Sequence, residues 1–177
     1  TITAALSNAQ ASLTRDVPFS TSGILKGIVR RQNGQPVAGA RVENVYFSTV
    51  TTGADGRYFF GGVPAGMPTL RGTVDHPQGT ALNVLPQTVA LAAGQVRDDV
   101  LLVEPTGAVT GTVRDADGNI QIGRPITLTA ASFSRYTTSD SAGRFTFSDV
   151  PVGTFSVSSS DPVSGFPSTR SVAVAAD

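Results

Sequence analysis

The chain has 177 residues, a length that allows one large domain or two small ones. Thirteen basic residues balance thirteen acidic ones, so the formal net charge is zero and no basic surface for nucleic acid is indicated. Cysteine is absent, which excludes disulfides, thiolate metal sites and a cysteine nucleophile. No run of about 18 apolar residues occurs, so the sequence predicts no membrane-spanning helix.

The first segment, residues 1–22, is predicted to be an N-terminal arm. Its second half contains "TRDVPF" (14–19), which alternates apolar and polar residues as a strand does. Pro18 is tolerable in such a strand only at a sheet edge or a bulge. The first half also carries apolar residues at roughly helical spacing from Ile2 to Leu13, so a short helix and a disordered terminus are the alternatives.

The rest of the chain consists of two similar copies. Their offset is 84 residues at the start and later changes by a few residues, as insertions and deletions in loops require. Copies of this size indicate two small domains, predicted at 23–105 and 106–177, rather than a solenoid of short units. The aligned pairs are "GIVRRQNGQPVAGARV" (27–42) with "GTVRDADGNIQIGRPI" (111–126), "ADGRYFFGGVPAG" (54–66) with "SAGRFTFSDVPVG" (141–153), and "TVALAAG" (88–94) with "SVAVAAD" (171–177).

Each copy is predicted to consist of β-strands. The first strand alternates, with Leu25 and Val29 on one face in the first copy and Val109 and Val113 in the second. Turn sequences such as "QNGQ" and "DADGN" separate the strands, since Asn and Gly tolerate positive φ. Short strands divided by frequent turns favour an antiparallel sandwich. Aromatic residues at a spacing of two are the predicted core anchors: Tyr58, Phe60, Phe145 and Phe147.

The shared pattern of G-x-V, a strand, and then G-x-F/Y-x-F-x-x-V-P-x-G resembles the carboxypeptidase regulatory-like family and the B-type repeats of bacterial surface adhesins. The resemblance covers residues 23–177. It implies an all-β fold of two tandem seven-stranded Ig/transthyretin-like sandwiches. It also implies non-catalytic modules of secreted or cell-surface proteins.

The two copies differ at their ends. The first continues into "QVRDDVLLVEP" (95–105), predicted to be its last strand with Val100 and Leu102 on one face. The second reaches Asp177 at the equivalent of Gly94, so its last strand is predicted to be missing. A sandwich without that strand exposes an unpaired edge that invites another strand.

The arm resembles the strand that the second copy lacks. Its Val17 and Phe19 are expected to keep the alternation of Val100 and Leu102. This similarity predicts that the arm of one subunit completes the second sandwich of the next, as strand addition to an exposed edge does. The alternative is an array of modules in which residues 1–22 are the tail of a preceding module. The predicted polymerisation residues are Leu13, Arg15, Val17 and Phe19 in the donor arm, and Val172 and Val174 at the acceptor edge.

Few residues suggest other chemistry. Asp115, Asp117 and Asn119, at a spacing of two, resemble part of a calcium loop. The distal glutamate of an EF-hand is absent, and the first copy has no carboxylate there, so a hairpin turn explains both copies. His76, the single histidine, is interpreted as a loop residue.

Of three further charged residues, Lys26 is interpreted as a surface group, and Asp98 and Asp99 as edge or surface groups. Lys26 alternates with Leu25, which places it on the solvent face and argues against an isopeptide bond of the adhesin type. Asp98 and Asp99 are strand neighbours whose side chains point to opposite faces, so they cannot share a proton as a catalytic pair.

The sequence therefore predicts a non-enzymatic structural protein, extracellular or on the cell surface, with no cofactor. Its main predicted partner is a second copy, bound head to tail in a filament or stalk with the arm beside residues 171–175. Other surface proteins and polysaccharide are further candidate partners. The alternative is a carbohydrate- or ligand-binding accessory module of a secreted or cell-surface protein.

Overall fold

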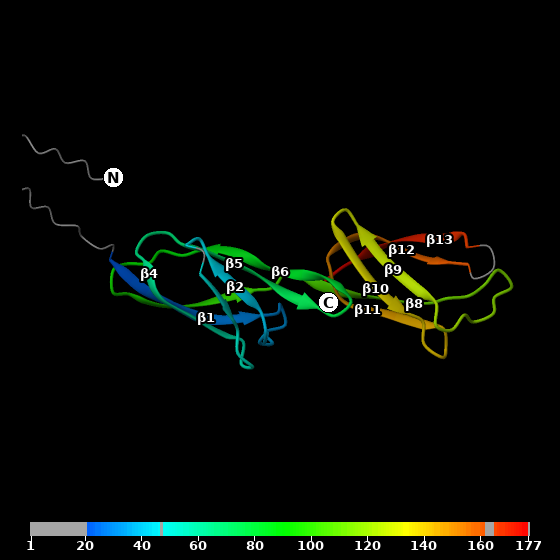
Figure 1. Cartoon of the computed structure of the whole chain (residues 1–177), viewed down its shortest axis with the longest axis horizontal. Helices are drawn as coiled ribbons and strands as arrows, with labels where there is room; N and C mark the ends of the chain where they lie inside the picture. Colours follow the sequence, from blue (N-terminus) through cyan, green and yellow to red (C-terminus); the bar gives the residue numbers. More distant parts are fainter. Residues whose placement is uncertain (1–20, 47, 162–164, 177) are drawn as a thin grey trace, which may run out of the picture.

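Two β-sandwiches lie end to end in the computed structural model, which describes residues 21–46, 48–161 and 165–176 (Figure 1). The described residues form thirteen strands and no helix, which confirms the predicted all-β fold. None of these elements is a helix long and apolar enough to cross a membrane. Residues 1–20, which carry the predicted donor positions, lie outside the described residues.

The first sandwich packs a three-stranded sheet against a four-stranded one. The smaller sheet has the order β4-β1-β7, in which β1 pairs antiparallel with β4 and parallel with β7. The larger has the order β6-β5-β2-β3. The strands are β1 (Ser22–Arg30), β2 (Arg41–Asn44), β3 (Thr49–Thr51), β4 (Arg57–Pro64), β5 (Thr69–His76), β6 (Gly79–Thr88) and β7 (Val96–Leu102).

The second sandwich repeats this order with one position empty. Its strand β8 pairs antiparallel with β11, as β1 pairs with β4, and the facing sheet has the order β13-β12-β9-β10. Within the described ranges, no strand takes the place that β7 has beside β1. The strands are β8 (Thr106–Thr112), β9 (Pro125–Ala130), β10 (Phe133–Thr138), β11 (Arg144–Pro151), β12 (Gly153–Ser160) and β13 (Pro167–Val174).

The two sandwiches share one sheet. A backbone pairing between Gly79 of β6 and Arg135 of β10 joins the two larger sheets into a single sheet of eight strands. Only Val103, Glu104 and Pro105 separate β7 from β8. The connection is therefore a continuous structural element rather than a free linker.

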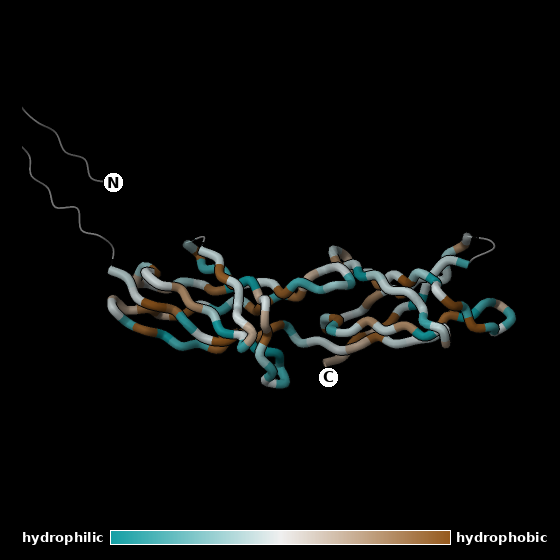
Figure 2. The backbone as a smooth tube through the Cα atoms, turned by 60° about the horizontal axis from the view of Figure 1, so that its bottom comes forward, coloured by the Kyte–Doolittle hydropathy of each residue, from teal (hydrophilic) through white to brown (hydrophobic). Residues whose placement is uncertain are grey.

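Each sandwich has its own hydrophobic core. Hydrophobic and hydrophilic residues alternate along strands of both sandwiches (Figure 2), as expected where one face of each sheet packs on a core. The predicted anchors Tyr58, Phe60 and Phe147 are buried, which confirms their assignment. Phe145 is only partly buried and packs against the second core. It lies where the second sandwich is open.

Val100 and Leu102 share one face of β7, as expected, and the structure shows that this face is the exposed one. Val100 and Leu102 are 51% and 38% exposed, whereas Asp99, Leu101 and Val103 are buried. Residues 100–103 are all apolar, so their sequence is compatible with either face pointing inward. The packing of the β7 backbone against β1 determines which face does. Asp99 lies opposite Gly27, and its carbonyl oxygen fills the space that a Cβ at that glycine would need.

Candidate functional site: the junction and the open edge of the second sandwich

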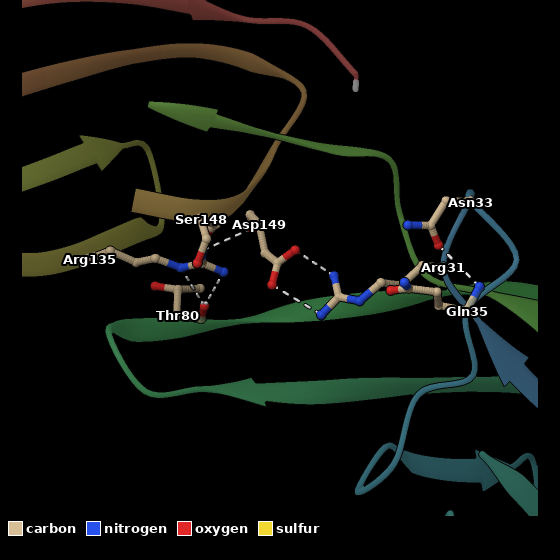
Figure 3. A network of polar contacts seen from close by, with 7 residues as sticks. All are labelled: Arg31, Asn33, Gln35, Thr80, Arg135, Ser148 and Asp149. Carbon is tan, nitrogen blue, oxygen red and sulfur yellow. Dashed lines mark hydrogen bonds and ion pairs between the residues drawn. The ribbon is translucent and has the colours of Figure 1, made fainter. Parts of the chain in front are cut away.

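A bidentate ion pair joins the two sandwiches. Arg31, just after β1, places its guanidinium nitrogens 2.5 and 3.0 Å from the two carboxylate oxygens of Asp149 in β11 (Figure 3). Both side chains are about 30% exposed, so solvent screens them less than a surface pair. The planar guanidinium and the carboxylate fix an orientation as well as a distance.

A second arginine lies at the centre of the junction. The side chain of Arg135 in β10 is fully buried and donates hydrogen bonds to three backbone carbonyls (Figure 3). Its Nη1 lies 2.7 Å from the oxygen of Ser148 and 2.8 Å from that of Asp149, while Nε and Nη2 lie 3.2 and 3.1 Å from that of Thr80 in the first sandwich. Burial lowers the pKa of this guanidinium, which stays charged at neutral pH.

Backbone geometry brings these carbonyls to Arg135. Asp149 has a φ of 52° at an irregularity in the pairing of β11 with β8, and this left-handed conformation turns the strand. The equivalent residue of the first copy is Gly62, which also has a positive φ. Sequence reasoning missed Arg135, although it follows Phe133 by two residues and so shares the core parity of a strand. That charge at a core position was the available signal.

Further contacts surround the two arginines. Gly79 has a φ of 134° and packs so closely on β10 that a Cβ there would lie 2.5 Å from the oxygen of Ser134. The backbone nitrogen of Tyr136 donates to the oxygen of Gln78, and the hydroxyl of Thr80 bonds to the backbone of Ser134. The relative orientation of the sandwiches is thus set by main-chain contacts and by charge.

His76 lies beside this junction, at the end of β5 rather than in a loop. Burial lowers the pKa of its imidazole, and the positive charge of Arg135 lowers it further. The neutral ring accepts a hydrogen bond at Nδ1 from the backbone nitrogen of Gln78. These contacts give His76 a structural role at the junction.

The open edge of β8 borders a groove between the two sheets of the second sandwich. The groove has a volume of about 690 Å³ and lies between β8 on one side and β12 and β13 on the other. In the first sandwich, β7 runs at the equivalent place beside β1. The apolar residues that line the groove of the second sandwich are Val109, Val113, Ile126, Phe145, Val157 and Val172.

Of the predicted acceptor residues, Val172 lines the groove on the side opposite β8, whereas Val174 lies beside Gly107 of β8. Val172 and Val174 belong to β13, which pairs with β12, and their side chains pack into the second core. In the first sandwich the last strand pairs with β1, not with β6. The unpaired backbone that matches this arrangement is therefore that of β8.

The calcium candidates form a hydrogen-bonded turn. Asp115 accepts bonds from the backbone nitrogens of Asp117 and Asn119 and from the side chains of Asn119 and Gln121. The bonds from Asn119 are the main cause of a lowered pKa of the Asp115 carboxyl. Among the described residues, no three His, Cys, Asp or Glu side chains form a group that could hold a metal.

The remaining charged residues divide between the surface and the core. Lys26 and Asp98 form an exposed pair at 3.8 Å, as expected for solvent-facing side chains. Asp98 and Asp99 lie on the edge strand β7, one of the two expected placements, but Asp99 is only 8% exposed and is therefore not a surface charge. Its carboxylate binds Arg97 at 2.7 Å. Burial, and then the negative charge of Asp99, raise the pKa of the neighbouring Tyr58.

Comparisons with known proteins relate both copies to one domain family. The family model described as "Carboxypeptidase regulatory-like domain" matches residues 24–100 and 108–177. No curated protein matches the chain.

Solved structures show a similar fold. A streptococcal ancillary pilin is 17% identical with a TM-score of 0.51, over 86% of this chain and 59% of that one, so this chain spans about three fifths of that pilin's length. The shaft pilin SpaA of Lactobacillus rhamnosus GG is 12% identical with a TM-score of 0.42, over 90% of this chain and 95% of that one. The TIE protein of Bacillus anthracis is 19% identical with a TM-score of 0.36, over 89% and 32%.

Replacing the buried arginine is expected to weaken the second sandwich and the junction together. Arg135→Met should lower the free energy of unfolding by about 2–4 kcal/mol, because three buried carbonyls lose their donors. Urea denaturation measures the loss. Arg144→Met, which removes an exposed ion pair with Asp140, is the matched control and should cost less than about 1 kcal/mol. Equal losses would contradict the central role of Arg135.

The single histidine should make stability depend on pH. Because its folded pKa is lowered, the stabilising contribution is present above the unfolded pKa of about 6.5 and is lost as the pH falls below it. Thermal unfolding between pH 7.5 and 5.5 should show a larger fall in melting temperature for the native chain than for His76→Gln. Parallel curves would show that His76 does not couple to folding.

Proposed function

The chain belongs to the carboxypeptidase regulatory-like domain family, and from this premise we propose that it is a non-enzymatic structural protein of the cell surface or the extracellular space. Its subunits join head to tail into a filament or stalk by β-strand complementation. The observation that supports this proposal is that, among the described residues, no strand pairs with β8 on the side where β1 pairs with β7 in the first sandwich.

The fixed junction suits a load-bearing role. A three-residue connection, a shared sheet, the buried Arg135 and the Arg31–Asp149 pair all resist bending between the sandwiches. A rod made of such subunits would stay stiff between its contacts. The ancillary pilin structure shares this all-β architecture, and a surface role comes to this chain as part of the proposal.

Exposed apolar side chains at the two far ends of the molecule support head-to-tail contact. Beyond the start of β1, they follow β2 and β4, where the Tyr46 hydroxyl approaches Gly66. Beyond the end of β8, they occupy the turn near Gly143 and the segment before β13. Such residues favour protein contacts when they gather on a surface. The two sets are Val45, Tyr46 and Met67 at one end, and Ile120, Ile122 and Phe166 at the other.

Charges placed in the arm should block assembly without unfolding the sandwiches. The double variant Val17→Asp, Phe19→Asp is expected to give discrete particles in electron micrographs where the native chain gives fibres, since two carboxylates would replace the side chains proposed to pack on the apolar part of the groove, at Val109 and Phe145. The control Ser12→Asp, Thr14→Asp adds the same charge at the opposite parity and should still form fibres. Fibres from both variants would overturn strand complementation, and discrete particles from the native chain would favour the carbohydrate- or ligand-binding module.

A further inference from the structure

We propose that the groove along β8 is filled by residues 14–20 of a second copy, running parallel to β8 in the register that β7 keeps with β1. This inference rests on the proposed function. It adds the acceptor strand, the direction of the donor and the contacts of each donor residue. It also moves the acceptor edge from β13 to β8.

The first sandwich is the template for this register. Lys26 pairs with Asp98, and Ile28 pairs with Val100. Adding the 84-residue offset of the two copies to β1, and subtracting it from β7, places Thr14 opposite Thr110 and Asp16 opposite Thr112. On the acceptor side no insertion is needed, because the same offset relates the start of β1 to the start of β8.

This register fills the core. Positions 101 and 103 of the template point inward, where Leu101 and Val103 are almost completely buried. The offset assigns these positions to Val17 and Phe19 of the donor, one residue away from the expected match with Val100 and Leu102. Both donor side chains would lie against the apolar part of the groove lining, at Val109, Phe145 and Val172, and would bury apolar surface there.

Pro18 is compatible with this register and not with a shift of one residue. The backbone nitrogen of Val103 donates to the oxygen of Arg30, so the N–H groups of odd-numbered residues in this strand point toward β1. Residues of a parallel strand alternate in this respect, and the N–H of Leu102 therefore points away from the neighbouring strand. Pro18 takes the position of Leu102 and loses no hydrogen bond to β8.

A glycine keeps room for the incoming backbone. In the template, the carbonyl of Asp99 occupies the space beside Gly27 that a Cβ would fill. The equivalent residue in β8 is Gly111, where the ring of Phe145 lies 2.5 Å from the position of such a Cβ. The ring is the movable end of a side chain, so it can turn aside when the donor backbone arrives.

Direction shows why the donor belongs to a second copy. β8 leaves the junction and runs toward the far end of the second sandwich, and a parallel donor must end there too. Residue 20 precedes Thr21 and β1, and β1 begins at the opposite end of the molecule (Figure 1). One strand of nine residues spans about 30 Å. If a chain inserted its own arm, residue 20 would lie at the far end of the second sandwich. The single residue between it and β1 could not span the length of both sandwiches.

Disulfide trapping in the full chain tests the register directly, because the native sequence has no cysteine. The variant Thr14→Cys, Thr110→Cys should form a ladder of linked subunits on a non-reducing gel after mild oxidation, since neighbouring strands bring the two Cβ atoms into disulfide range. The variant Arg15→Cys, Thr110→Cys, with one cysteine facing the core, should give at least tenfold less product. So should Thr14→Cys, Ser171→Cys, which tests the edge of β13.

Each other outcome overturns the inference in a distinct way. A ladder from the Ser171 variant alone would place the acceptor at β13 and leave the proposed function intact. An intramolecular link would exclude the second copy. Fibres that form without any link to the arm, and that persist when residues 1–20 are deleted, would overturn the proposed function itself. Unlinked monomers would assign the groove to another occupant.

A second variant tests the role of the glycine. Gly111→Ala is expected to reduce the yield of fibres at least tenfold, because its Cβ would occupy the space that, at the equivalent Gly27, the backbone of β7 fills. Thr110→Ala, on the outward face of the same strand, should assemble as the native chain does. Circular dichroism verifies that both variants are folded. Normal assembly of a folded Gly111→Ala chain would contradict the close approach of the donor backbone to β8.

Discussion

The pairing of the first and last strands is the contact on which the architecture depends. In the first sandwich, β7 lies parallel to β1, and its inward residues cover the side of the core that the connecting loops leave open. Gly27 permits this close approach, because the carbonyl of Asp99 occupies the space of its missing Cβ. The second sandwich has the same glycine and the same first strand, and its groove lies where that contact is made.

The junction between the sandwiches has a different physical basis. Burying the charge of Arg135 is costly unless every donor is satisfied, and here carbonyls from both sandwiches accept its hydrogen bonds. The contact therefore links the second sandwich internally, through Ser148 and Asp149, and also joins it to Thr80 of the first sandwich. The Arg31–Asp149 pair adds a second polar contact between the two sandwiches.

Much of the fold could be predicted from local pattern. Alternation identified the inward face of β1 and β8 from Leu25 and Val109, and paired aromatics identified the core. The face of β7 could not be predicted in this way, because the run from Val100 to Val103 is apolar at every position and fits both faces. Arg135 was missed for a related reason: an arginine is assigned to the surface until its partners are known.

The all-β class, the two copies, and the likeness between the arm and the last strand of the first copy could all be read from the order of residues. These features follow from periodicity and from turn residues, which act over short stretches of chain. The packed fold was needed to show which way β7 faces, which carbonyls surround Arg135, and that, among the described residues, no strand lies beside β8 where β7 lies beside β1. Each of these depends on residues far apart in sequence that meet only when the sheets pack.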